Sequence, residues 1–423
     1  MTTRSTELLR VVHSRPGVTR ADAARLLGVG TGAATELVTK LSKAELLAQA
    51  PAAPSGTRGR PTTVLLPHPG GPLVLAAAIT HESWRIDVVE LGGTTAASRT
   101  GRHAGSDWPA VRTAVAAAIQ DLLRGYAHRP RAIGVSVPGT VRSLRLQAAN
   151  AGWHDADLTE LWPGAEVFVA GNDATLAAAA ESHRGAAAQA TVALHLRIDA
   201  GLGGAVVEHG RPVIGAHGAA GEFGHMPFGD PAVPCPCGAH GCWGSAVDGT
   251  ALARHLGDPT PRDPVTYARR VIAVARTAVA RTAVAHTAGT RDSITRAPGT
   301  ANAEATSADR PDRSTRSRQD LAGLPPPDPT DALDAVRAAG TALGRGMAGL
   351  VNALDVDLIT LGGLGADLLD TVPEQIHDAY RRGLMMIHRD TPPPVLRATL
   401  ADEDGPVAGA AEEAWAALLP TLT

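Results

Sequence analysis

The sequence predicts an α/β protein that carries a small helical domain at its amino-terminal end. Between residues 71 and 257, apolar segments of strand length alternate with alanine-rich segments of helix length, a pattern typical of α/β folds. Residues 1–70 instead contain three short segments with apolar residues at helical spacing. At 423 residues, the chain is too long for a single hydrophobic core, so we expect two or three domains.

The charge of the chain is distributed unevenly. Residues 1–70 contain nine Lys and Arg against four Asp and Glu, a balance of +5, whereas the remainder contains 30 against 38. A basic end on an acidic body indicates that only the amino-terminal domain meets a polyanion.

The start of the chain is charged and leads directly into a helical pattern, which is unlike a secretory signal. No apolar run approaches the roughly 20 residues that span a bilayer. We therefore expect a cytoplasmic protein without a membrane partner.

Residues 1–43 predict three helices. Leu8, Leu9 and Val12 share one face of the first helix, and Thr19 is placed to cap the second. A short glycine-containing turn before the third helix is typical of a helix-turn-helix, whose later helix enters a DNA major groove. The side chains that helical position would place toward the groove include Thr31, Thr35, Thr39 and Lys40.

Two apolar segments, residues 46–48 and 63–66, predict a β-hairpin after these helices. The loop between them contains Arg58 and Arg60 among glycines, and arginines of this kind enter narrow minor grooves. Together these features predict a winged helix-turn-helix over residues 1–70. The alternative is a generic three-helix packing module, against which the basic loop and the charge asymmetry argue.

The body, residues 71–423, is predicted to continue to the end of the chain. Its predicted strands are residues 73–79, 84–91, 132–137, 166–170, 191–198, 204–208, 358–361 and 395–400, and its predicted helices are 108–124, 174–183, 267–285, 331–354 and 405–419. Residues 287–329 contain almost no large apolar side chain before Leu321. We expect this segment to be a disordered insertion.

Asn172 and Asp173 follow the predicted strand 166–170 and precede an alanine-rich helix. Carboxyl ends of strands are where α/β folds bind ligands, and Asp173 in that position suits a general base or a hydrogen-bond acceptor for a sugar hydroxyl. The alternative is that either residue serves only as the helix N-cap.

All three cysteines of the chain, Cys235, Cys237 and Cys242, lie within eight positions, and His225 precedes them by ten. Three thiolates and one imidazole form the ligand set of a closed, structural zinc site. The alternative is three free thiols in a glycine-rich loop. Glu222, three residues before His225, places a carboxylate beside the same loop.

Several motifs in this order resemble the ROK family of repressors and sugar kinases, in its subfamily of transcriptional regulators. They are GVSVPGT at residues 134–140, GNDA at 171–174, GLGG at 201–204, GAAGEFGHM at 218–226 and CPCGAHGC at 235–242. The resemblance implies an actin-like, sugar-kinase ATPase fold of two α/β lobes, and a structural zinc on His225, Cys235, Cys237 and Cys242. It also implies a sugar site of Asn172, Asp173, Glu222 and His225, in which Asp173 matches the catalytic base of the family's kinases.

The chain departs from the family pattern at two places. Where the kinases carry a phosphate loop after the first strand, this chain has Ala78, Thr80 and Glu82, and a carboxylate against a triphosphate is repulsive. We therefore expect a body that is not an enzyme. Gly244 stands where the family has a glutamate that contacts the sugar.

The sequence thus predicts a DNA-binding regulator of carbohydrate metabolism, in the form of a repressor with a sugar effector. A helix-turn-helix reads one half-site of a palindromic operator, so we expect a homodimer or homotetramer on double-stranded DNA. The alternatives are an ATP-dependent sugar kinase with an added amino-terminal domain, and a regulator that has lost sugar binding.

Overall fold

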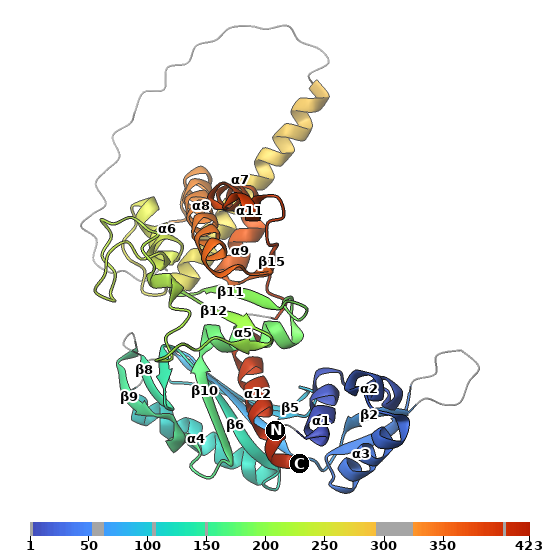
Figure 1. Cartoon of the computed structure of the whole chain (residues 1–423). Helices are drawn as coiled ribbons and strands as arrows, with labels where there is room; N and C mark the ends of the chain where they lie inside the picture. Colours follow the sequence, from blue (N-terminus) through green and yellow to red (C-terminus); the bar gives the residue numbers. More distant parts are fainter. Residues whose placement is uncertain (1–2, 53–62, 104–106, 149–150, 293–324, 401–402) are drawn as a thin grey trace, which may run out of the picture. The chain divides into compact units, whose positions relative to one another are not determined.

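The computed structural model shows an α/β protein (Figure 1). It describes residues 3–52, 63–103, 107–148, 151–292, 325–400 and 403–423, with the side chains of 282–292 left out. The chain divides into two compact units. Unit 1 comprises Met1–Thr191, Ala205–Gly221 and Thr399–Thr423, and unit 2 comprises Val192–Gly204 and Glu222–Ala398. Strands and helices occur in both units, which confirms the predicted α/β class.

Unit 1 begins with three helices and a hairpin. These elements are α1 (Arg4–Ser14), α2 (Arg20–Leu27), α3 (Thr31–Lys43), β1 (Leu47–Pro51) and β2 (Thr63–Pro67). The hydroxyls of Thr3 and Thr19 cap α1 and α2, and Gly28 ends α2 in the left-handed conformation that glycine adopts easily. β1 and β2 pair antiparallel. The three helices and the hairpin expected from the sequence are therefore present in the described residues.

The main sheet of unit 1 has the strand order β10-β6-β3-β4-β5. Its strands are β3 (Leu73–Ile79), β4 (Ser83–Glu90), β5 (Thr95–Arg102), β6 (Pro130–Val137) and β10 (Val167–Asn172). β10, β6 and β3 run parallel to one another, β4 pairs antiparallel with β3, and β5 pairs antiparallel with β4. Alternate residues of β3 belong to two core clusters, one shared with α4 (Trp108–Gly125) and the other with α12 (Asp404–Leu418). The sheet is thus covered on both faces, which explains why β3 is apolar throughout.

Some strands of unit 1 were not predicted from the sequence. They are β5 and a small sheet of β7 (Thr140–Arg142), β8 (Arg145–Ala148) and β9 (Trp153–Asp157). β5 lies at the edge of its sheet and most of its residues are exposed, so it lacks the apolar signal on which sequence patterns depend.

Helix α12 approaches its neighbours at backbone distance. A Cβ atom added to Gly134 of β6 would overlap the carbonyl oxygen of Ala410, and one added to Gly409 would overlap that of Leu176 in α5 (Asp173–Arg184). Glycine is required at both positions because any side chain would separate α12 from the sheet or from α5.

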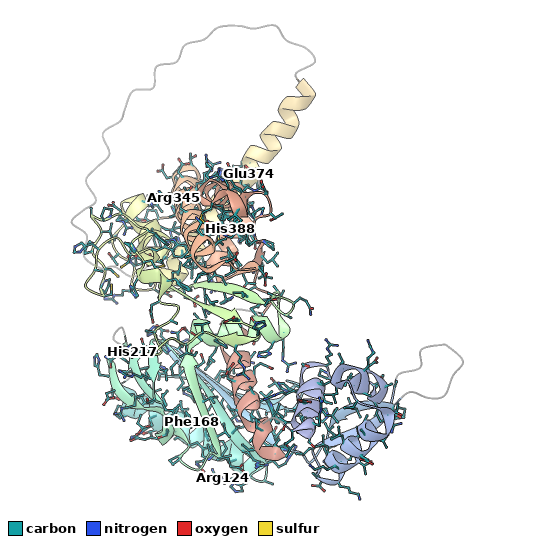
Figure 2. All side chains as sticks on the ribbon, in the orientation of Figure 1. Arg124, Phe168, His217, Arg345, Glu374 and His388 are labelled. Carbon is teal, nitrogen blue, oxygen red and sulfur yellow. The ribbon has the colours of Figure 1, made fainter. Side chains whose placement is uncertain are left out.

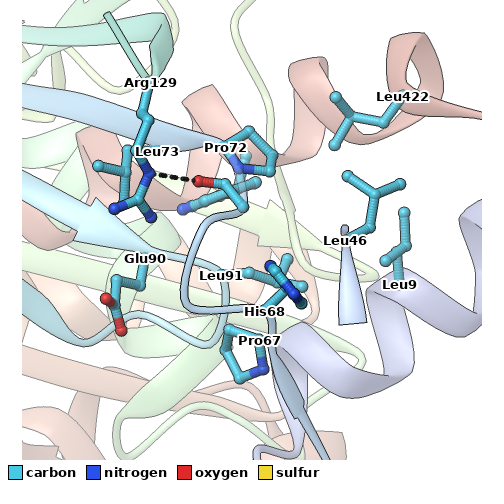
Figure 3. Close-up of a pocket in the computed structure, with 12 residues that line it drawn as sticks. Leu9, Leu46, Pro67, His68, Pro72, Leu73, Glu90, Leu91, Arg129 and Leu422 are labelled. Atoms are coloured by element: carbon cyan, nitrogen blue, oxygen red, sulfur yellow. Dashed lines mark hydrogen bonds between the residues drawn. The ribbon is translucent and has the colours of Figure 1, made fainter. Parts of the chain in front are cut away.

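The amino-terminal elements share a core with the rest of unit 1. Leu9 of α1 and Leu46 lie beside Pro67, Leu73 and Leu422 around a narrow pocket, and Arg129 donates a 3.0 Å hydrogen bond to the Gly71 carbonyl there (Figure 3). Apolar residues of the three amino-terminal helices belong to the same hydrophobic cluster as residues of the main sheet and α12. The amino-terminal elements therefore share one core with the rest of unit 1.

Unit 2 is built on β11 (Val192–Ile198), β14 (Leu358–Gly363) and β15 (Val395–Arg397), with β12 (Leu202–Glu208) beside β11. The far end of β12 lies in unit 1, where it pairs with β13 (Arg211–Pro212). The helices of unit 2 are α6 (Gly249–Leu256), α7 (Pro264–Asp292), α8 (Pro329–Leu354), α9 (Leu364–Thr371), α10 (Pro373–Gly383) and α11 (Met386–Arg389). α8 packs against both α7 and α10.

The predicted insertion at 287–329 is only partly within the described residues. The backbone of α7 continues to Asp292, so the predicted helix end at Ala285 is wrong, because the alanine-rich repeat carries helical hydrogen bonding past that residue. Residues 293–324 lie outside the described part of the chain. Among the helices that the structure describes, none is sufficiently long and apolar to cross a membrane.

Candidate functional site

A group of four side chains in unit 2 could hold a metal ion. In the described part of the chain, one ligand atom from each of His225, Cys235, Cys237 and Cys242 lies within 4.8 Å of the others. Cys235 Sγ is 3.7 Å from His225 Nδ1, and Cys237 Sγ is 3.6 Å from Cys242 Sγ. Tetrahedral coordination with bonds of about 2.3 Å to sulfur and about 2.0 Å to nitrogen separates ligand atoms by about 3.5–3.8 Å. The residues therefore fit a tetrahedral ion.

Short-range hydrogen bonds fold the cysteine loop around this point. The Cys235 amide donates to Ala239 O at 2.8 Å, and the Gly229 amide donates to Gly241 O at 2.9 Å. Gly238 and Gly241 have φ angles of +94° and +69°, which only glycine adopts without strain. The two glycines between Cys237 and Cys242 therefore allow the turn that brings the sulfurs together.

Metal binding would change the protonation of the thiols. Burial, followed by the neighbouring Cys235 and Cys237 sulfurs, raises the pKa of Cys242 to about 12. A hydrogen bond with the Ala239 backbone, followed by one from Cys235, lowers the pKa of Cys237. A metal ion binds thiolates, so binding here would displace the proton of Cys242.

His225 connects the cysteines with Glu222. Its Nδ1 faces Cys235, while its Nε2 lies 3.8 Å from Glu222 Oε2. A histidine that binds metal through one ring nitrogen commonly directs the other toward a carboxylate. Both side chains are roughly half exposed, at 49% and 44%, so Glu222 remains open to solvent and to a ligand.

Trp243, which sequence reasoning missed, anchors the cysteine loop on helix α8. Its side chain is fully buried, its indole N–H donates to Ala342 O at 3.0 Å, and its ring fills the space left by Gly346. Phe228 meets the ring edge-on, with centroids 5.8 Å apart. The signal was present in the sequence, since a large aromatic residue directly follows the last cysteine.

Asn172 and Asp173 lie at the carboxyl end of β10 in unit 1, as the sequence predicted. The Asn172 side-chain oxygen accepts from the amides of Ala174 and Thr175, and its Nδ2 donates to Gly139 O at 3.0 Å. Asn172 is thus the N-cap of α5, which confirms the alternative role considered for it.

The structure brings some of the predicted site residues together. The four metal ligands and Glu222 gather in unit 2, and Asn172 adjoins Asp173 in unit 1. A joint sugar site of Asn172, Asp173, Glu222 and His225 stays a prediction, because its members belong to different units. Gly244 begins a single helical turn in unit 2. His217, labelled in Figure 2, belongs to unit 1 and lies outside the metal group.

The turn after β3 is closed by its own side chains. The Thr80 hydroxyl accepts from the amides of Glu82 and Ser83 at 3.3 and 3.1 Å. Glu82 forms an exposed ion pair with Arg102 at 2.8 Å. The carboxylate of Glu82 is therefore paired, which moderates the repulsion expected for it.

On α3, the residues predicted to face DNA are exposed. The hydroxyls of Thr35 and Thr39 donate to the carbonyls of Thr31 and Thr35, both at 2.8 Å. Lys40 Nζ lies 3.3 Å from Ser5 Oγ of α1. Arg58 and Arg60 lie outside the described residues.

Comparisons with known proteins agree with the motifs. Residues 93–313, just over half of the chain, match the model of the ROK family. A glucokinase of Halalkalibacterium halodurans is 30% identical over 154 residues, which are 34% of this chain and 46% of that protein. The chain spans about half the length of the curated relatives it matches.

Two solved structures share the fold. One is a ROK family transcriptional regulator, a homologue of the Escherichia coli MLC protein, with a TM-score of 0.66 and 20% identity over 99% of this chain and 97% of that one. The other is a ROK hexokinase from Thermus thermophilus, with a TM-score of 0.58 and 24% identity over 82% of this chain and 99% of that one. These similarities show a sugar-kinase fold for the body.

The comparisons contradict the prediction that the chain is not an enzyme. Its curated relatives are named sugar kinases, and structural neighbours include a hexokinase and a glucokinase. The changes at Ala78, Thr80 and Glu82 were insufficient to decide the point, because a phosphate loop supplies only part of the contacts that catalyse phosphoryl transfer.

Proposed function

Because the chain belongs to the ROK family, we propose that it is a DNA-binding transcriptional regulator, acting as a repressor, whose body binds a sugar. The observation that supports this most is the arrangement of α1–α3 and the β1–β2 hairpin ahead of the sugar-kinase fold. Similarity to a ROK regulator extends over 99% of the chain, against 82% for the hexokinase. In this proposal residues 1–70 form a winged helix-turn-helix and residues 71–423 form the sensing body.

Selection from a random library of double-stranded DNA tests the regulator. The full chain should enrich a palindromic sequence, because a symmetric homodimer or homotetramer presents two DNA-binding domains related by symmetry. Enrichment no better than that of a variant lacking residues 1–70 would contradict the proposal.

The DNA contacts are expected to come from Thr31, Thr35, Thr39 and Lys40 on α3, and from Arg58 and Arg60. Replacing both arginines by alanine should weaken binding to all sequences and reduce the slope of log K against log salt by about 2, one for each positive charge removed from the DNA interface. Titration of the selected duplex at several salt concentrations measures the slope. An unchanged slope would show that these arginines do not contact the DNA. The control is Arg99→Ala on the exposed strand β5.

Zinc is the ion proposed for His225, Cys235, Cys237 and Cys242, because three sulfur ligands and one imidazole favour it. With all four positions filled by protein, the ion would hold the loop and take no part in chemistry. Bound there, it would fix the side chain of His225 and, through it, the position of Glu222.

The sugar is expected to contact Asn172, Asp173, Glu222 and His225. Glu222→Gln should weaken binding about tenfold or more, since a hydrogen bond to a charged acceptor is stronger than one to a neutral amide. Calorimetric titration with glucose, N-acetylglucosamine and N-acetylmannosamine measures this. Glu208→Gln, an exposed change elsewhere, is the control. Equal sugar affinity of both variants would show that Glu222 does not contact the sugar. Absence of binding of all three sugars to the wild type would contradict sugar sensing.

A second candidate function is ATP-dependent phosphorylation of a sugar. The named activities of the curated relatives favour it, and Asp173 directly follows β10 at the position expected for the general base of a kinase. A coupled assay for ADP release with the same three sugars tests it, with Asp173→Asn as the control for contaminating kinases. Release that depends on sugar and is lost in Asp173→Asn would support catalysis by this chain.

A further inference from the structure

A buried cluster of polar side chains joins helix α1 to the body of unit 1. His13, in the last turn of α1, is 7% exposed, and Glu412 of α12 is 4% exposed. His13 Nε2 lies 2.9 Å from Glu412 Oε2, and Arg184, the last residue of α5, pairs with the other carboxylate oxygen. The three residues come from three helices that are far apart in the sequence.

The hydrogen bonds of His13 define its protonation pattern. The Gly92 amide donates to His13 Nδ1 at 2.9 Å, so Nδ1 is an acceptor and the ring proton lies on Nε2, from which it is donated to Glu412. Arg184 also donates to the Gly92 carbonyl at 2.9 Å. The side chains of His13, Glu412 and Arg184 thus each form a hydrogen bond or an ion pair with another element of unit 1.

The cluster is strongly ionic. Burial alone would raise the pKa of Glu412, but the hydrogen bond from His13 and the positive charge of Arg184 hold the pKa of this carboxyl below its usual range. The carboxylate is therefore charged at every physiological pH. A buried charge of this kind is tolerated only while its partners stay in place.

Helices α5 and α12 form one rigid pair. Gly409 of α12 lies directly on the carbonyl of Leu176 in α5, and Gly405 lies on Ala177. Backbone contact without intervening side chains leaves little room for the helices to slide. Any displacement of α5 is therefore shared by α12, which carries Glu412.

The two ends of α5 lie at different places in the molecule. Its first turn holds Asn172 and Asp173, and its last residue is Arg184. Twelve residues of α-helix span about 18 Å. The helix thus leads from the proposed sugar contacts to the junction with α1.

We propose that the α5–α12 pair transmits sugar binding at Asn172 and Asp173 to the amino-terminal helices, with the His13–Glu412–Arg184 cluster as the joint. The inference rests on the proposed function, since it names how the sugar site would act on the DNA-binding elements. A ligand shifts such a joint only if it binds its two arrangements with different affinity.

Hydrogen exchange on the full chain tests the joint. Deuterium uptake of residues 4–14 is followed with and without whichever of glucose, N-acetylglucosamine and N-acetylmannosamine binds in calorimetry. In the wild type, the sugar should change uptake in this segment. In Glu412→Gln, uptake should be about tenfold faster without sugar, the sugar should bind with unchanged affinity, and it should cause no further change.

Two further variants keep the result interpretable. Asp404→Asn breaks the 2.6 Å ion pair of Arg85 at the other end of α12 and should keep the sugar response. His13→Leu removes the joint from the α1 side and leaves Glu412 with Arg184, so it should reproduce Glu412→Gln even if that variant folds poorly. Uptake of residues 73–79 in β3 reports whether the body is intact.

The outcomes separate the joint from the proposed function. Binding of a sugar without a change in residues 4–14, or an equal change in wild type and His13→Leu, would overturn the joint while sugar sensing stands. Absence of binding by all three sugars would overturn sensing itself, and the joint with it.

Discussion

Replacing Cys242 by serine is expected to remove zinc from the chain and to destabilise unit 2. Cys242 is the buried member of the group, and its sulfur lies 3.6 Å from Cys237 Sγ. A structural zinc contributes on the order of 10 kcal/mol to the folding of small zinc domains, so we expect loss of about 5 kcal/mol or more here. Elemental analysis should fall from about one zinc per chain to near none, and calorimetry should show a clearly lower Tm.

The matched control for this variant is His240→Ala. His240 lies in the same loop between Cys237 and Cys242 but is exposed and outside the ligand group, so its variant should keep the metal and the wild-type Tm. Retention of a full equivalent of zinc by Cys242→Ser would show that the ion binds elsewhere.

The metal group could be predicted from the sequence because its ligands are local. Three of them lie within eight positions, and the positive-φ glycines that fold the loop stand between them. Only the approach of His225 and the anchor of Trp243 depend on contacts outside the loop. Trp243 packs on α8, which begins 86 residues later at Pro329, and no local pattern specifies that distance.

The apolar central strand β3 was predictable from the sequence, and the polar edge strand β5 was not. β3, which is covered on both faces, is apolar along its whole length, whereas the exposed edge strand β5 carries few apolar residues. The same reasoning explains the partial success at Asn172. Its position after a strand predicted either a ligand contact or a cap, and the cap is a local hydrogen bond that the structure shows.

The return of α12 to unit 1 could not be predicted, because it depends on contacts between residues hundreds of positions apart. The prediction of a helix at 405–419 was confirmed, but no sequence pattern indicates that it packs on β6 and α5 or that Glu412 meets His13. A glycine within a helix was the available signal, since it favours close packing where it is kept despite its low helix propensity.

Gly409→Ala is accordingly expected to destabilise unit 1 strongly. An alanine Cβ at this position would overlap the Leu176 carbonyl oxygen, a backbone atom that cannot move without displacing α5. Although alanine is the better helix former by about 1 kcal/mol, forcing two packed helices apart costs about 3 kcal/mol or more. Calorimetry should therefore show a lower Tm, and the same shift would loosen α1, since α12 carries Glu412 and Trp415, which contact it.

Gly125→Ala at the end of α4 supplies the comparison, because its added Cβ would meet nothing within 4 Å. That variant should melt close to the wild type or slightly above it, as helix propensity alone predicts. If the free energy of unfolding of Gly409→Ala also lay within about 1 kcal/mol of the wild-type value, α5 and α12 would not be in backbone contact. The rigid pair on which transmission from Asn172 to His13 depends would then lose its physical basis, because a side-chain layer can repack where a backbone contact cannot.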